Sequence, residues 1–189
     1  KKINHIARYF SNNDYNSILF GLQHVTYHVE TLGFNKIFPE RPADDVVKNI
    51  TDNIDNKLFK KPFYAEVNFF EPHRPFDYGG IKPFRSKGVY IPKYIPNNRN
   101  IKKEFAAMQG AIKKMDESVG KIINILKKKN LYQNTIIIFT TDHGIPFPRA
   151  KGTLYDAGIE SSLIISYPKL KIKNKKFNEL NFNIDILPT

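Results

Sequence analysis

Cysteine is absent from this 189-residue sequence, so disulfides, thiolate metal sites and cysteine nucleophiles are excluded within it. Long apolar runs are absent as well, since none approaches the roughly 18 to 20 residues that a membrane-spanning helix needs. Without cysteine, the redox compartment of the protein cannot be inferred from the sequence. The sequence also leaves the cellular location and the oligomeric state open.

Acidic residues are scarce: 18 Asp and Glu stand against 30 Lys and Arg, a net charge of +12. One interpretation is attraction to a polyanion, such as nucleic acid, an anionic lipid, or a sulfated or phosphorylated substrate. The other is a lysine-rich composition spread over a solvated surface, because the lysines extend from Lys1 to Lys176 with few clusters. Charge alone leaves both interpretations open.

Apolar residues make up 41% of the chain and aromatic residues 13%, which is typical of a folded globular protein. Apolar residues at spacings of three and four predict helices over 42–57 and 101–126. Residues 76–100 are rich in proline and polar residues and predict a long surface loop. The expected strands are 17–24, continued by 25–28, then 63–70, 134–141 and 161–167.

Strands that alternate with helical segments predict an α/β fold, with a mostly parallel central sheet and helices on both faces. The run Ile136-Ile137-Ile138-Phe139 has no polar alternation, as expected of a strand buried on both faces of a parallel sheet. It stops at Asp142-His143-Gly144. Because ligands bind at the carboxyl ends of such strands, we expect chemistry at Asp142 and His143.

Four of the five histidines lie at or near the ends of expected strands: His24, His28, His73 and His143. A lone histidine is usually structural, but a set at one edge of a sheet indicates a site. Asp142 next to His143 joins an oxygen ligand to an imidazole, which suits a divalent cation. Calcium takes six or more oxygens, so further carboxylates would be required. A simple turn after the strand is the alternative.

The segment Thr140–Gly158, with Asp-His-Gly followed by Ile-Pro-Phe-Pro, resembles the C-terminal part of the sulfatase catalytic domain in the alkaline-phosphatase-like superfamily. It is most similar to the sulfamidase (N-sulfoglucosamine sulfohydrolase) branch. Four further segments resemble motifs of this family, in the family's order. They are Gly21–Val25 (Gly-Lys-x-His), Phe69–Pro75 (His-Asp-Pro-His), the helix 105–126 with Met115-Asp116-Glu117-Ser118-Val119-Gly120, and Asn183–Thr189 (Asp-Leu-x-Pro-Thr).

The resemblance implies hydrolysis of a sulfate ester or sulfamate on a sulfated carbohydrate, with no nucleic acid as partner. In that family Asp142 and His143 would bind the divalent metal, normally Ca²⁺. His73 would contact the sulfate or the leaving group, His24 would orient or protonate groups around the nucleophile, and Lys151 would hold a sulfate oxygen.

Two arginines, Arg74 and Arg149, are candidates to bind the substrate anion, with exposed surface charge as the alternative. Two positions depart from the family pattern: Leu22 stands where the family has lysine, and Phe70 where it has the first histidine of His-x-Pro-His. Leu22 removes a cation that would help to hold the nucleophile or the sulfate.

The formylglycine nucleophile of sulfatases arises in a Cys/Ser-x-Pro-x-Arg segment, which this sequence does not contain. Its one Asp-Asp pair, Asp44-Asp45, lies in an expected helix rather than at a strand end. We therefore expect residues 1–189 to be the central and C-terminal part of one sulfatase-type catalytic domain, truncated at both ends and inactive alone. Two alternatives remain: a phosphodiesterase or phosphatase of the same superfamily, with a Thr or Ser nucleophile and zinc or manganese, and a non-catalytic basic module that binds polyanions.

Overall fold

The structure, a computed structural model, describes residues 4–86, 88–171 and 175–187. Contacts divide the chain into two compact units, Lys1–Ile125 and Leu126–Thr189. The first unit contains α1 (Ile6–Ser11), β1 (Asn16–Gly21), β2 (Lys36–Phe38), α2 (Ala43–Asn53), β3 (Phe63–Asn68) and most of α3 (Arg99–Lys128). The second contains β4 (Ile137–Thr140), α4 (Asp156–Ile159) and β5 (Leu163–Ser166). Along the described ranges, no helix combines the length and apolarity that crossing a membrane requires.

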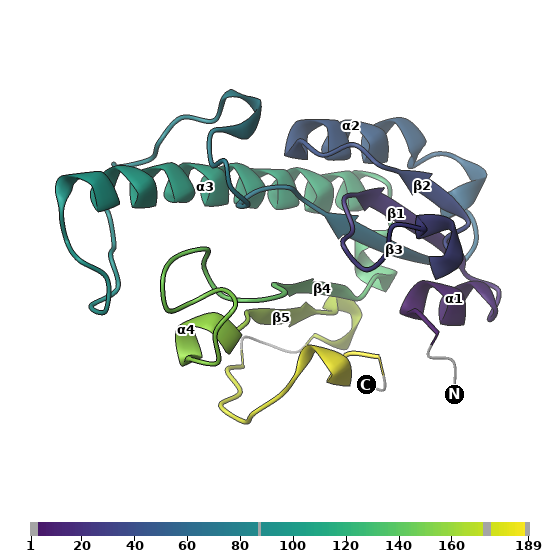
Figure 1. Cartoon of the computed structure of the whole chain (residues 1–189). Helices are drawn as coiled ribbons and strands as arrows, with labels where there is room; N and C mark the ends of the chain where they lie inside the picture. Colours follow the sequence, from purple (N-terminus) through teal and green to yellow (C-terminus); the bar gives the residue numbers. More distant parts are fainter. Residues whose placement is uncertain (1–3, 87, 172–174, 188–189) are drawn as a thin grey trace. The chain divides into compact units, whose positions relative to one another are not determined.

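The first unit is built on a parallel three-stranded sheet in the order β2-β1-β3. The central strand β1 is buried along nearly its whole length, because α1 and α2 cover opposite faces of the sheet (Figure 1). On one face Phe10 of α1 stacks on Tyr64, and on the other Phe20 packs against Phe59, which follows α2. This is the predicted parallel sheet with helices on both faces.

Gly21 ends β1 with a φ of 94°, and a Cβ at this position would lie 1.8 Å from the carbonyl oxygen of Asn68. Only glycine permits this backbone conformation and this approach of β3. The carboxyl ends of β1 and β3 are therefore close together. The expected continuation of the first strand through 25–28 is wrong, because the chain turns into a loop after Gly21.

The helices α2 and α3 confirm the two predicted helical segments. Pro42 precedes the first turn of α2, whose apolar stripe is buried. Lys114 and Lys121 of α3 form ion pairs with Asp44 of α2. Asn130, with a φ of 58°, follows the end of α3, where the Asn130 and Leu131 amides donate back to carbonyls of the last turn, a Schellman C-cap.

The second unit corrects the prediction for the apolar run 136–139. β4 pairs antiparallel with β5, and its burial alternates, with Ile138 42% exposed. An uninterrupted apolar run indicates only that both faces of a strand can be covered by other residues. It does not determine whether the strand pairs parallel or antiparallel, because its partner strand comes from another part of the sequence. The predicted strand 161–167 is confirmed as β5. The motif Asn183–Thr189 begins with one short turn, Asn183–Asp185, and its residues Pro188 and Thr189 lie outside the described residues.

Candidate functional site

In the first unit, His24 and His73 follow the carboxyl ends of the neighbouring strands β1 and β3. Their rings meet edge to face with centroids 6.5 Å apart. Both side chains are exposed, so neither is a core histidine satisfied by packing. The structure thus brings together two of the predicted site residues, at the edge of a parallel sheet where ligands bind.

The loop that carries His24 is held by the side chain of Gln23. Its Oε1 accepts hydrogen bonds from the amides of Val25 (2.7 Å) and Thr26 (3.1 Å), and its Nε2 donates to the Thr26 carbonyl. This closed turn fixes the backbone on both sides of His24. In contrast, His28 lies away from the strand end, is largely exposed and pairs with Glu30 at 3.3 Å, so it does not join the set.

The loop that carries His73 is anchored by Glu71, whose side chain is 4% exposed. The Oε1 atom of Glu71 accepts a hydrogen bond of 3.1 Å from the amide of Ala43, the first residue of α2. A carboxylate at a helix N-terminus is favoured by the helix dipole. The other oxygen, Oε2, is buried without a hydrogen bond. Glu71 therefore ties the histidine loop to α2.

The hydrogen bond of the His73 ring indicates which of its two nitrogens carries the proton in the neutral form. The Nδ1 atom lies 2.6 Å from the carbonyl oxygen of Arg74, and a carbonyl only accepts, so Nδ1 carries the proton. In the neutral ring Nε2 is then left as the free acceptor. An imidazole held in this way can donate or accept a proton at Nε2.

The guanidinium of Arg74 is engaged by its own unit. It forms an ion pair with Glu104 of α3 and lies over the ring of Phe76, 4.5 Å from its centroid. These contacts fix the segment after His73 on α3. Arg74 thus has a structural role in addition to the substrate contact predicted for it.

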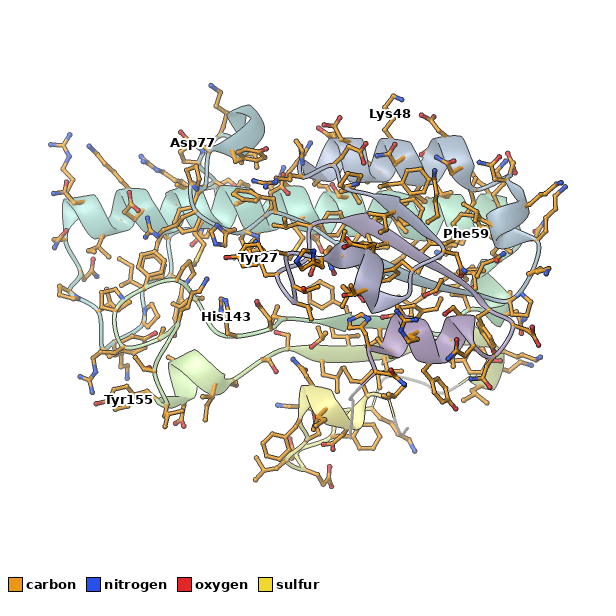
Figure 2. The ribbon with its side chains drawn as sticks, turned by 45° about the vertical axis from the view of Figure 1, so that its right-hand side comes forward. Tyr27, Lys48, Phe59, Asp77, His143 and Tyr155 are labelled. Atoms are coloured by element: carbon orange, nitrogen blue, oxygen red, sulfur yellow. The ribbon has the colours of Figure 1, made fainter. Side chains whose placement is uncertain are left out.

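In the second unit, Asp142 and His143 lie on the loop that follows β4; His143 is labelled in Figure 2. Asp142 is 85% exposed and His143 34%. Asp142 Oδ1 accepts a hydrogen bond of 3.0 Å from the His143 amide, and Oδ2 lies 3.3 Å from His143 Nε2. His143 Nδ1 donates to the Gly144 carbonyl at 2.7 Å. In the neutral ring, two acceptor atoms consequently face each other.

Two facing acceptors, a carboxylate oxygen and an imidazole nitrogen, suit a shared cation, so this pair fits as part of a divalent metal site. It is not a complete one. Within the described ranges, no three His, Asp or Glu side chains gather in a group that could hold a metal ion. Asp44 and Asp45 lie in the first turn of α2, as the sequence predicted, and not at the end of a strand.

The loop after Gly144 is closed by the carbonyl of Ile145, which accepts hydrogen bonds from the amides of Phe147 (2.9 Å) and Lys151 (3.0 Å). Gly144 packs so closely on the start of α4 that a Cβ would lie 1.8 Å from the Ala157 carbonyl oxygen. Lys151 is exposed. The hydrogen bond between Lys151 and Ile145 therefore brings the backbone of Lys151 close to the segment that begins at Asp142.

Arg149 adopts a φ of 60°, and its guanidinium lies over the ring of Tyr155, 4.8 Å from the centroid. Tyr155, which precedes α4, is labelled in Figure 2. The predicted residues thus form two groups, His24, His73 and Arg74 in one unit, and Asp142, His143, Arg149 and Lys151 in the other. Sequence reasoning missed the residues that hold the first group, Gln23, Glu71 and Glu104. Their only signal in the sequence was a position near a histidine, for Gln23 and Glu71, or within the predicted helix, for Glu104.

The chain matches the family model Sulfatase over residues 2–189. It is 36% identical over 100 residues to an ulvan-active sulfatase of Formosa agariphila, covering 52% of this chain and 17% of that protein. It is 26% identical over 153 residues to the human N-sulphoglucosamine sulphohydrolase, covering 68% of this chain and 30% of the relative. The chain therefore spans less than a third of the length of these two relatives.

Solved structures support the fold. A protein from work on the metabolism of glycosaminoglycans by Bacteroides thetaiotaomicron gives a TM-score of 0.68 at 17% identity, over 86% of this chain and 47% of that one. A protein solved with its substrate D-glucosamine-2-N,6-O-disulfate gives 0.64 at 14% identity, over 86% and 55%. The match over nearly all of its residues shows that this chain belongs to the sulfatase family.

Proposed function

We propose that these residues form the central and C-terminal part of a sulfatase-type catalytic domain that hydrolyses a sulfate ester or sulfamate of a sulfated sugar. The observation that carries the proposal is the meeting of His24 and His73 at the ends of β1 and β3. Relatives named for ulvan and for N-sulphoglucosamine, and a fold neighbour bound to a disulfated glucosamine, support a sugar substrate.

The chemistry explains why two exposed imidazoles suit this reaction. When the bond between sulfur and the leaving oxygen or nitrogen breaks, negative charge grows on the leaving atom. In the proposal His73 contacts the sulfate or the leaving group through Nε2, and a proton from an imidazole neutralises that charge. His24 orients groups around the nucleophile, and the Gln23 turn limits the positions its ring can take.

Cations would stabilise the sulfuryl oxygens. Lys151 holds one of these oxygens in the proposal, and Arg149 and Arg74 contribute further positive charge toward the substrate anion. Asp142 and His143 would be two of the ligands of a calcium ion, with the remaining ligands coming from other residues. When bound, calcium would supply positive charge for the nucleophile and the sulfuryl oxygens.

The nucleophile in this proposal is a formylglycine supplied by residues other than these 189. The test compares sulfate release from D-glucosamine-2-N,6-O-disulfate by the enzyme that carries both this chain and the formylglycine segment with release by this chain alone. We expect turnover only from the former. Sustained turnover by this chain alone would contradict the assignment of the nucleophile. Cleavage of a phosphodiester in preference to the sulfated sugar would contradict the proposed reaction.

A further inference from the structure

Four cationic side chains surround an open pocket of about 470 Å³ in the first unit. Arg85 comes from the loop before α3, while Arg99, Lys102 and Lys103 come from the first turns of that helix. On a helix, residues three and four apart share a face, so the three helical cations point to one side. The lining also includes the amides Asn97 and Asn98 and one valine. We call this set the basic pocket.

The wall that carries Arg85 is firmly attached to α3. Gln109 donates from Nε2 to the carbonyls of Phe84 (3.1 Å) and Gly88 (3.0 Å), and its Oε1 accepts from the Tyr90 amide (3.1 Å). The Phe84 amide also donates to a carbonyl of α3. The pocket is thus bounded by a braced loop and a long helix, so binding an anion would require little ordering of the backbone.

The basic pocket carries positive charge that no acidic side chain of the described residues neutralises. In the part of the chain that the structure describes, none of its four cations forms an ion pair, and the first turn of α3 contains no acidic residue. The nearest acid in sequence, Glu104, is already paired with Arg74. The Asn98 side chain caps the helix by accepting from the amides of Asn100 and Ile101. An anion here would consequently meet side-chain charge, not free backbone amides.

We infer that the basic pocket binds an anionic glycan, so that the substrate is an oligosaccharide with several sulfate or carboxylate groups. The inference rests on the proposed function. Asn97 and Asn98 offer amides for sugar hydroxyls, while cations bind the acidic groups. Single-stranded nucleic acid is less suitable, because its binding sites stack bases on aromatic side chains and the lining contains none.

The ion pair of Arg74 with Glu104 connects the basic pocket with the histidines of the same unit. Glu104 follows Lys103 directly on α3, and its carboxylate binds Arg74, the residue after His73. The loop with His73 is therefore fixed beside the turns of α3 that carry the pocket's lysines. A chain with repeated anionic groups could place one near His73 and another in the basic pocket.

The test measures binding of a heparin-derived hexasaccharide to the 189-residue chain by titration calorimetry. The variant R99Q/K102Q/K103Q should bind about tenfold or more weakly, since each exposed charge pair contributes a modest amount. The matched control K57Q/K60Q/K61Q removes the same charge from exposed lysines outside the pocket, and it should stay within about twofold of the parent. Gln109→Ala, which keeps every charge but frees the loop, should give an intermediate loss.

Equal weakening in both triple variants would reduce the effect to net charge and overturn the inference, as would unchanged affinity in R99Q/K102Q/K103Q. Binding of a thymidine dodecamer as tight as that of the hexasaccharide, with the same sensitivity to the three substitutions, would also overturn it. The readout is independent of turnover. Pocket-dependent binding without sulfate release from the complete enzyme would contradict the proposed function alone, and release with pocket-independent binding would contradict the pocket alone.

Discussion

The imidazoles of His24 and His73 lie edge to face, 6.5 Å between centroids, because they follow adjacent parallel strands whose ends are drawn together at Gly21. General acid–base catalysis by a positioned side chain contributes about 10²- to 10⁴-fold in rate. We therefore expect His73→Ala to lower kcat for a sulfated glucosamine by at least about 100-fold in the complete enzyme. His28→Ala, which removes an exposed histidine paired only with Glu30, is the control and should leave kcat unchanged. An equal loss in both variants would contradict the role of His73.

The facing acceptors of Asp142 and His143 predict a response to calcium that can be measured without catalysis. Titrating Ca²⁺ into the complete enzyme, which would supply the remaining ligands, should shift the amide NMR signals of residues 142–144, and EDTA should reverse the change. Asp142→Ala removes the carboxylate that accepts a hydrogen bond of 3.0 Å from the His143 amide. This variant should abolish the response. Asp156→Ala, which removes an acid from the first turn of α4, should retain it. Identical shifts in both variants would place the ion elsewhere.

Replacing the buried Glu71 should lower the stability of the fold without changing the charge of the surface. Glu71→Ala removes the buried acceptor of the Ala43 amide, and losing such a helix cap costs about 1–2 kcal/mol. Glu71→Gln keeps an acceptor and should lose less. The measurement is the free energy of unfolding in urea, with the exposed Glu40→Ala, just before α2, as control. If Glu71→Ala unfolds at the same urea concentration as Glu40→Ala, the cap contributes nothing.

Two glycines should respond to alanine in opposite directions. At Gly21 both the φ of 94° and the 1.8 Å approach to the Asn68 oxygen oppose a Cβ, so Gly21→Ala should destabilise by at least about 2 kcal/mol. At Gly120, within α3, nothing lies within 4 Å of a Cβ, and Gly120→Ala should stabilise by about 0.5–1 kcal/mol. Urea unfolding of both variants checks this. A loss at Gly120 comparable to that at Gly21 would show that the close approach at the end of β1 is not the cause.

The sequence predicted those features that local periodicity encodes. The stripe of α3 and the apolar runs of β1 and β3 follow from spacing alone, and Asp142 and His143 are neighbours in the chain. The antiparallel pairing of β4 was not predictable, because an apolar run does not specify its partner. Nor was the burial of Glu71, since no pattern distinguishes a carboxylate that caps a distant helix from one at the surface. The residues that position the histidines could therefore be identified only from the structure.

Asp44 gives α2 and α3 a pH-dependent connection. A hydrogen bond from Lys114, with a smaller contribution from Lys121, lowers the pKa of the Asp44 carboxyl below its ordinary value. A depressed folded-state pKa adds stability that is present above the unfolded value, about 3.9, and is lost as pH falls through the folded value. Because the Asp44 side chain is 60% exposed, solvent screening limits the effect to about 0.2–1 kcal/mol. Asp44→Asn should therefore lower the free energy of unfolding at pH 7 by this amount more than Asp45→Asn, since both remove an acid from the first turn of α2. The difference should shrink in urea titrations as the pH is lowered toward 2, because the carboxyl becomes protonated as the pH passes below its folded-state pKa. A difference that persists unchanged at that pH would mean that the ion pairs with α3 are not its source.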